Sequence, residues 1–216
     1  MAITLYGYWR SSATYRVRIA LNLKQLDYTY LPVHLVKEGG GQHKAEYITL
    51  NPTELVPTLV DEDGNVLNQS LAIIEYLDDL YPHTTLLLPQ SALHKARVRT
   101  LAQDIACDIQ PLANLRVLQY LKNPLPCSDE EQKAWCQHWI EAGFKGIEQR
   151  LKSSAGDYCF GNKVTMADVC LVPQVYNALR FAVAMDNYPL IQQIYHNCNR
   201  LPAFVAAKPE NQPDAE

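Results

Sequence analysis

The residues best suited to chemistry lie in one short stretch, Tyr8-Trp9-Arg10-Ser11-Ser12-Ala13-Thr14-Tyr15-Arg16-Val17-Arg18. Two serines stand where an apolar strand over residues 3–6 is expected to turn into a helix that starts near Ala13. A helix N-terminus offers free backbone N–H groups and a positive dipole end, and the hydroxyls of serine add donors. The pattern predicts an anion site at Ser11 and Ser12. An ordinary helix cap followed by a solvated basic face is the alternative interpretation.

The arginines of this stretch run against the charge of their surroundings. Residues 1–82 hold six Lys or Arg and ten Asp or Glu, whereas the remaining 13 and 13 cancel. Arg10, Arg16 and Arg18 make up half of the basic residues in that acidic part. The net charge of −4 offers no basic surface, so we expect no nucleic-acid partner. A small carboxylate is a better match for the planar guanidinium group.

The cysteines and the hydropathy pattern bear on the cellular compartment. All six cysteines follow residue 100, and their spacing fits neither a zinc site nor a dithiol redox site. We therefore expect no metal, and buried, reduced thiols in a cytoplasmic protein. The chain has no charged-then-apolar leader and no apolar run near 20 residues, so we expect no membrane association.

The hydrophobic pattern changes from mixed to purely helical along the chain. Strands are expected at 3–6, 28–33, 58–60 and 66–67, with a hairpin turn at Asp63-Gly64, and helices at 13–25 and from Ser70 to before Pro82. From residue 91 on, helices are expected at 91–122 with a kink at Pro111, at 129–153, from Thr165 to about Phe181, and near 188–197 and 201–207. The tail from Lys208 is expected to be disordered. The pattern predicts an α/β domain over 1–82, a linker over 81–90 and an all-α domain over 88–210.

Three helix starts carry recognisable capping signals. Ser70 is the expected N-cap of its helix, and Ser128 to Glu131 reads as a capping box. Thr165-x-x-Asp168 is a second box, so Asp168 is expected to be structural rather than an acid catalyst. Upstream, Gly39-Gly40-Gly41 predicts a mobile loop. A phosphate cradle is the alternative there, but the Gly-Lys-Ser/Thr ending of such loops is missing.

Several separated stretches together resemble the glutathione S-transferases, and most closely their zeta class, the maleylacetoacetate and maleylpyruvate isomerases. The matching stretches are Ser11-Ser12-x-x-x-Arg16-Val17-Arg18-Ile19-Ala20-Leu21, Gln69-Ser70-Leu71-Ala72-Ile73-Ile74-Glu75-Tyr76-Leu77, Gln110-Pro111-Leu112-x-Asn114, and Ala167-Asp168 to Leu171-Val172-Pro173-Gln174-Val175. The resemblance covers nearly the whole chain. It implies a thioredoxin-like N-terminal domain, followed by a helical glutathione-transferase C-terminal domain, and a homodimer.

The resemblance also implies glutathione as cofactor and assigns its contacts. A cis peptide before Pro57 would turn the Val56 backbone toward the cysteinyl amide, and Gln69 with Ser70 would bind the γ-glutamyl carboxylate. The remaining implied cofactor contacts are Ser11, Ser12, Ala13, Arg16, Gln42, Gln110, Asn114 and Arg116. Animal zeta enzymes carry a cysteine where this chain has Ala13. The serines and the helix N-terminus are then the local means of stabilising a sulfur anion.

For activity, the resemblance implies cis–trans isomerisation of a small dicarboxylic maleyl substrate in aromatic amino-acid or aromatic acid catabolism. The thiolate would add to the double bond, the new single bond would rotate, and the sulfur would leave. Ser11 and Ser12 would stabilise the sulfur anion, and Arg10 and Arg180 would bind the carboxylates of the substrate. A general transferase or a dehalogenase acting on halogenated acids is the alternative enzyme. A binding protein without catalysis is a third reading, against which the retained serines speak.

Overall fold

A computed structural model describes residues 2–216 and divides them into two compact units. The first unit holds the chain up to Leu87 together with Arg200–Glu216, and the second holds Leu88–Asn199. This grouping differs from the predicted domains 1–82 and 88–210 at two places. Residues 83–87 stay with the first unit because the buried Lys24 donates to Thr84 Oγ1 and Thr85 O, and Asp78 accepts from Leu87 N.

The first unit is built on a four-stranded sheet with the order β2-β1-β3-β4. Its strands are β1 (Ile3–Gly7), β2 (Tyr28–Pro32), β3 (Thr58–Val60) and β4 (Val66–Asn68), and its helices before the crossover are α1 (Ser12–Leu23), α2 (Ala45–Leu50) and α3 (Ser70–Leu80). The strand β1 runs parallel to β2 and antiparallel to β3, which forms a hairpin with β4. The predicted strands and the thioredoxin-like fold are confirmed.

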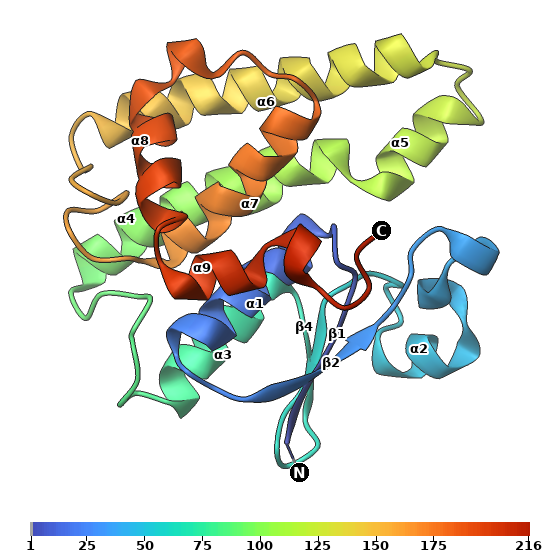
Figure 1. The fold of residues 1–216 in the computed structure, drawn as a ribbon, viewed down its shortest axis with the longest axis horizontal. Helices are drawn as coiled ribbons and strands as arrows, with labels where there is room; N and C mark the ends of the chain where they lie inside the picture. Colours follow the sequence, from blue (N-terminus) through green and yellow to red (C-terminus); the bar gives the residue numbers. More distant parts are fainter. Residues whose placement is uncertain (1) are drawn as a thin grey trace. The chain divides into compact units, whose positions relative to one another are not determined.

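The helices α1 and α3 cover one face of this sheet, and α2 lies away from them (Figure 1). The core beneath them consists of buried aliphatic side chains, which are Ile3, Leu5, Val17, Leu21, Leu59, Ile73 and Leu77. Alternate residues of β1 enter this core, as a half-buried strand requires. The apolar face of α1 supplies Val17 and Leu21 at helical spacing, so the sheet and the two helices fix one another.

The register of the strands brings four connecting segments to one edge of the sheet. Gly7 pairs with Pro32, and Thr58 pairs with Tyr6 on one side and Asn68 on the other. The segments that continue from this edge are residues 8–11, 33–44, 56–57 and 69. We call it the turn edge. Because backbone pairing sets the register, the turn edge is a rigid support for whatever the four segments hold.

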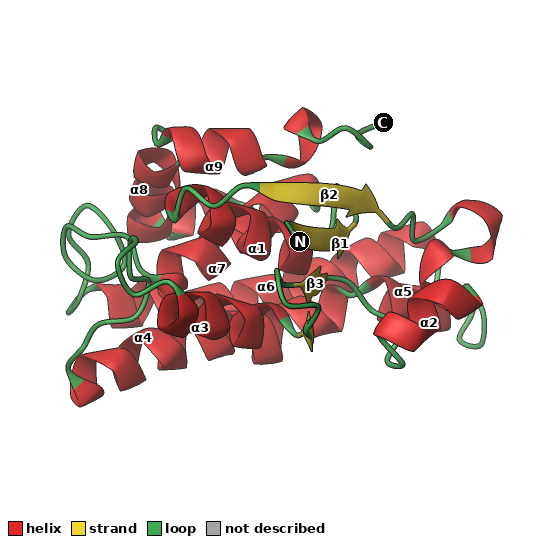
Figure 2. Ribbon diagram, turned by 90° about the horizontal axis from the view of Figure 1, so that it is seen from below, coloured by secondary structure: helices red, strands yellow, loops and turns green. Residues whose placement is uncertain are grey.

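The chain returns to the first unit at its end. The helix α9 (Pro202–Ala207) packs on α1, where Arg18 Nε donates to Ala207 O at 3.0 Å and Asn22 Nδ2 donates to Ala203 O at 3.0 Å (Figure 2). A 3₁₀ turn follows at Pro209–Asn211, and Gln212 Nε2 donates back to the carbonyl of Ala206. The predicted disorder from Lys208 is therefore wrong, because the tail satisfies the carbonyl groups that α9 leaves open.

The second unit is helical, with α4 (Ala92–Gln103), α5 (Leu115–Lys122), α6 (Asp129–Leu151), α7 (Met166–Arg180) and α8 (Pro189–Cys198). The predicted continuous helix over 91–122 is wrong. It breaks into a π-helical stretch, Asp104–Ile109, and a 3₁₀ turn, Gln110–Ala113, before α5 begins. Pro111 explains the break, since it has no N–H to donate to the carbonyl four residues earlier. A side chain at Gly143 of α6 would lie 2.2 Å from Ile109 Cδ1, so glycine permits the close packing there.

Both predicted capping boxes are present. Ser128 Oγ accepts from Glu131 N at 3.1 Å, and Glu131 Oε2 accepts from Ser128 N at 2.7 Å. Asp168 is fully buried and accepts from Thr165 N and Cys159 N, each at 2.8 Å, and from Thr165 Oγ1 at 3.0 Å. Burial raises the pKa of Asp168, and these hydrogen bonds oppose the shift. Its contacts are those of a structural residue.

All six cysteines are free thiols. Burial was predicted for every one of them, and it holds for Cys136, Cys159, Cys170 and Cys198. Cys107 is exposed and Cys127 is half-buried, because both lie on the irregular path between α4 and α6. Within residues 2–216, no helix is long and apolar enough to cross a bilayer, and no three metal-binding side chains gather.

Candidate functional site

The serine turn leaves β1 at the turn edge and begins α1 one residue before the predicted start. Ser11 is the N-cap, with φ −69° and ψ 119°, and its Oγ accepts a hydrogen bond from Thr14 N at 3.2 Å. Because the oxygen is used as an acceptor, the hydroxyl proton is left to donate outward. The helix itself provides no acceptor for the N–H groups of Ser12 and Ala13. The turn therefore leaves several donors without an acceptor in the helix, which is the arrangement that an anion site needs.

Gly7 allows α1 to start this close to the strand. A Cβ atom at Gly7 would lie 2.2 Å from Thr14 Cγ2, so any other residue would force the buried Thr14 side chain or the backbone to shift. The first turn of α1 therefore packs directly on the end of β1. Its orientation is fixed by the sheet rather than by a flexible loop.

Arg10 stands at the outer side of this turn. Its side chain is exposed, and its guanidinium carbon lies 5.3 Å from the centre of the Trp9 ring. The stacking on Trp9 restricts the arginine without using its hydrogen-bond donors. Within residues 2–216, the donors of Arg10 thus stay open next to Ser11 while its stacking on Trp9 gives it a defined direction.

A buried arginine links α1 to the start of α3. Arg16 NH1 donates to Ser70 Oγ at 3.1 Å, and both side chains are almost fully buried. The prediction that Ser70 is the N-cap is wrong. Gln69 holds that position with φ +70°, and Ser70 is the first helical residue. The hydroxyl accepts from Arg16 in place of its own helix, and the N-termini of α1 and α3 are held together.

The predicted cis peptide is present between Val56 and Pro57. The pairing of β3 begins at Thr58, so the backbone of Val56 lies beyond the ladder. On its N-terminal side the loop is anchored, because Tyr47 Oη and Asn51 Nδ2 both donate to Leu55 O, at 2.6 and 2.7 Å. Val56 therefore offers a short, fixed backbone edge at the turn edge.

Gln42 lies in the glycine-rich segment, which forms two 3₁₀ turns, Lys37–Gly39 and Gly41–His43, where a mobile loop was predicted. Gly40 occupies the left-handed region at φ +95°, which favours glycine. The side chain of Gln42 is buried, and its Nε2 donates to Leu35 O at 3.2 Å. Its Oε1 is buried and accepts no hydrogen bond from residues 2–216. An acceptor of this kind is suited to a ligand N–H group.

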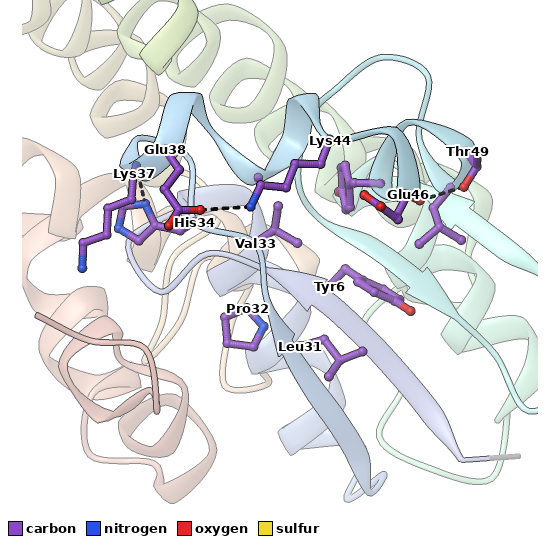
Figure 3. A pocket seen from close by; sticks show the side chains of 13 residues that line it. Tyr6, Leu31, Pro32, Val33, His34, Lys37, Glu38, Lys44, Glu46 and Thr49 are labelled. Carbon is purple, nitrogen blue, oxygen red and sulfur yellow. Dashed lines mark hydrogen bonds and ion pairs between the residues drawn. The ribbon is translucent and has the colours of Figure 1, made fainter.

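A hollow of about 710 Å³ lies beside this segment, between the end of β2 and α2 (Figure 3). None of the predicted site residues line it. Three of its charged side chains already pair within the protein, since Lys44 binds Glu38 at 3.1 Å and Lys37 binds Glu216, and the fourth, Glu46, is a carboxylate. The hollow therefore offers an anionic ligand no unpaired cation among these side chains, and the turn edge is the stronger candidate site.

Four predicted residues lie in the second unit. Asn114 is the N-cap of α5, and its Oδ1 accepts from Arg116 N at 3.2 Å. Gln110 opens the 3₁₀ turn just before it and is half-buried. Arg180 ends α7, is exposed, and lies 4.6 Å from the centre of the Phe181 ring. The structure thus brings Asn114 and Arg116 together.

Two features near the serine turn escaped the sequence reasoning. Arg18 is fully buried, and its NH2 donates to Trp9 O at 2.9 Å. Asp214 was expected to be disordered, yet its Oδ2 accepts from Trp9 N at 3.0 Å. The two residues of that contact are 205 positions apart, so no local pattern could have revealed it.

The arrangement at the turn edge fits an extended peptide with two anionic groups. The N-termini of α1 and α3 are the two places that favour negative charge, and Val56 offers a backbone edge with which a peptide can pair. Glutathione carries a thiol that can ionise and an α-carboxylate, joined through amides. The residues present therefore fit this cofactor.

Comparison with known proteins leads to the same family. Residues 10–80 match the model of the glutathione S-transferase N-terminal domain, and residues 117–206 match the model of its C-terminal domain. A probable maleylacetoacetate isomerase of Vibrio cholerae serotype O1 is 57% identical, with 100% of this chain and 99% of the relative covered.

Two solved structures with similar folds belong to the same family. The holo structure of a maleylpyruvate isomerase, described as a bacterial zeta-class glutathione S-transferase, superposes with a TM-score of 0.94 at 46% identity, covering 99% of this chain and 100% of the other. A maleylacetoacetate isomerase from Methylobacterium extorquens AM1, solved with malonate and glutathione bound, has a TM-score of 0.93 at 37% identity and covers 99% of both chains.

Proposed function

Because the chain belongs to the glutathione S-transferase family, among the zeta-class maleylacetoacetate and maleylpyruvate isomerases, we propose that it isomerises a maleyl diacid to its fumaryl form with glutathione as cofactor. The observation that carries the proposal is the strand register. It joins the Ser11 turn, the Val56–Pro57 peptide and the start of α3 at the turn edge. A site assembled in this way can hold a peptide thiol in one orientation.

We propose that Ser11 and the N-terminus of α1 keep the cofactor thiol ionised. When bound, glutathione supplies a thiolate that adds to the maleyl double bond and is released unchanged after rotation. A free thiol has a pKa of about 8.5, and one hydrogen bond to a charged acceptor is worth about 1.5–3 kcal/mol, or about one to two pKa units. The Ser11 hydroxyl is poised for this because Thr14 N already occupies its acceptor side. Ser12 and the N–H of Ala13 add donors, in the absence of a cysteine.

The remaining residues of the turn edge are assigned to the peptide part of glutathione. Ser70 and Gln69, at the start of α3, bind the γ-glutamyl carboxylate, and Arg16 adds positive charge through its contact with Ser70. The backbone of Val56, set by the cis bond to Pro57, pairs with the cysteinyl amide. The open Oε1 of Gln42 suits an N–H of the tripeptide.

Arginines are assigned to the carboxylates of the substrate. Arg10 is exposed and directed by its stacking on Trp9, and Arg180 and Arg116 are exposed in the second unit. Guanidinium groups bind carboxylates through paired hydrogen bonds. The related structure solved with malonate and glutathione bound supports a dicarboxylate ligand. Gln110 and Asn114 complete the proposed polar contacts to the cofactor.

We further propose a homodimer that works in the cytoplasm, in the breakdown of aromatic amino acids or aromatic acids. Six free thiols are compatible with a reducing compartment. The family resemblance supports the dimer and the metabolic role. Light scattering on the purified chain tests the dimer, which predicts twice the chain mass of 24.5 kDa.

The decisive assay follows the absorbance of the maleyl compound with and without glutathione. The proposal predicts loss of the maleyl form only when glutathione is present, with the amount of free glutathione unchanged. Consumption of glutathione, or release of halide from a halogenated acid in place of isomerisation, would identify a conjugating transferase or a dehalogenase. Absence of any glutathione-dependent turnover would reject the proposal.

A further inference from the structure

The last residues of the chain lie against the serine turn. We call Lys208–Glu216 the C-terminal tail, which reaches the turn edge after α9 (Figure 1). Asp214 Oδ2 accepts from Trp9 N at 3.0 Å and from Tyr30 Oη at 3.3 Å. Trp9 stands two positions before Ser11, in the turn that ends in the N-cap. A carboxylate from the end of the chain therefore fixes the backbone at the start of the proposed thiol site.

The backbone of Trp9 is held from both sides. Arg18 NH2 donates to Trp9 O at 2.9 Å, while Asp214 accepts from Trp9 N. Arg18 is fully buried, which lowers its pKa, and the negative charge of Asp214 is among the groups that oppose this shift. The same guanidinium donates to Ala207 O at the end of α9. A buried cation and a carboxylate thus clamp one residue of the turn.

The C-terminal tail also holds the segment that carries Gln42. Glu216 pairs with Lys37, and its Oε1 lies 3.2 Å from His34 Nε2. His34 in turn organises the loop, since its Nδ1 accepts from Lys37 N at 2.8 Å and its carbonyl accepts from Gly41 N at 2.7 Å. Two segments of the turn edge are therefore tied to the same stretch of chain.

We propose that Asp214 is a positioning residue for the thiol site, acting through the backbone of Trp9 on the direction of the Ser11 hydroxyl. The inference rests on the proposed function, because it concerns the same cofactor. Without the carboxylate, Trp9 N loses its acceptor, and the Trp9 backbone keeps its carbonyl contact with Arg18 but has no contact on the N–H side. A small displacement of a positioned donor weakens its effect on the thiolate much more than it weakens binding of the rest of the tripeptide.

The test compares four variants of the tail. Asp214→Ala removes the acceptor, and Asp214→Asn keeps an oxygen for Trp9 N without the charge. Glu210→Ala is the matched control, since Glu210 is an exposed carboxylate of the same tail. Asp214→Ser also removes the acceptor of Trp9 N, because the serine hydroxyl is too short to reach it, but this variant keeps a polar side chain. The readouts are the pKa of the bound glutathione thiol, from the ultraviolet absorbance of its thiolate, the isomerase rate, and the melting temperature.

Asp214→Ala and Asp214→Ser are expected to raise the pKa of the bound thiol and to lower kcat by about tenfold, with Asp214→Asn recovering most of the loss and Glu210→Ala matching wild type. A merely structural tail would lower the melting temperature while the thiol pKa stays at the wild-type value. That result, with an active wild type, would overturn this inference alone. A wild-type protein that binds no glutathione would overturn the inference together with the proposed function.

Discussion

Replacing Ser11 by alanine tests how the serine turn works, and the structure sets the size of the effect. The hydroxyl has two duties, since it accepts from Thr14 N as the N-cap and, in our proposal, donates to the thiolate. Loss of the cap lowers the free energy of unfolding by about 0.5–2 kcal/mol. Loss of the bond to sulfur removes about 1.5–3 kcal/mol, which corresponds to about a 10- to 150-fold lower kcat/KM near neutral pH.

The two effects are separated by Ser11→Gly. Glycine is tolerated at an N-cap with a loss of only a few tenths of a kcal/mol, but it has no hydroxyl. The glycine variant should therefore keep nearly wild-type stability in urea unfolding and still show the full loss of activity. Ser12→Ala tests the second hydroxyl separately, because Ser12 lies inside the helix and is not its N-cap.

The pH dependence of the activity shows whether Ser11 acts on the ionisation of the thiol. Ser11 acts by keeping the thiol ionised, so the gap between wild type and variant should narrow as the pH rises above about 8.5, where a free thiol ionises unaided. A deficit of constant size between pH 6 and pH 10 would contradict this reasoning. An unchanged rate in both Ser11 variants would move the role to Ser12 or to the backbone N–H groups.

Three further variants test other parts of the account. Arg180→Ala should raise the KM for the diacid about fivefold, because an exposed ion pair is worth up to about 1 kcal/mol, and should leave glutathione affinity unchanged; a weaker affinity for glutathione in titrations would contradict its assignment. Asp168→Ala should lower the free energy of unfolding by about 2–5 kcal/mol, since two buried N–H groups lose their acceptor, and a variant as stable as wild type in urea would refute the structural role. For Asp61, the hydroxyl of Tyr76 and the amide of Asn65 lower the pKa to about 2, so its contribution to stability is present above the unfolded-state pKa of about 3.9 and is lost as the pH falls toward 2. Urea midpoints should therefore converge for wild type and Asp61→Asn over that range, and a constant difference would argue against the shift.

The parts of the fold that the sequence predicts well are those with local causes. The capping boxes at Ser128 and Thr165, the hairpin at Asp63-Gly64 and, to within one residue, the start of α1 each follow from neighbours a few residues apart. The cis bond before Pro57 is different. A Val-Pro pair does not predict a cis bond by itself, because most X-Pro bonds in folded proteins are trans. The cis bond was predicted only through the family resemblance.

The predictions that were wrong concern residues whose contacts come from distant parts of the sequence. Ser70 has the right type for an N-cap, but Arg16 of another helix claims its hydroxyl and Gln69 takes the capping position. The C-terminal tail looks disordered by composition, yet Asp214 fixes it by accepting hydrogen bonds from Trp9 N and Tyr30 Oη. Side chains separated by nearly the whole chain leave no periodic signal, so such contacts emerge only from the folded structure.

The central claim is that glutathione serves as a returning cofactor for isomerisation. The most direct measurement is a proton NMR time course of the vinylic signals of the maleyl substrate, with glutathione present at a small fraction of the substrate concentration. The account predicts that the fumaryl signal grows far beyond one equivalent of glutathione, while the glutathione signals stay unchanged. Product that stops at one equivalent, or that forms equally fast without glutathione, would contradict it.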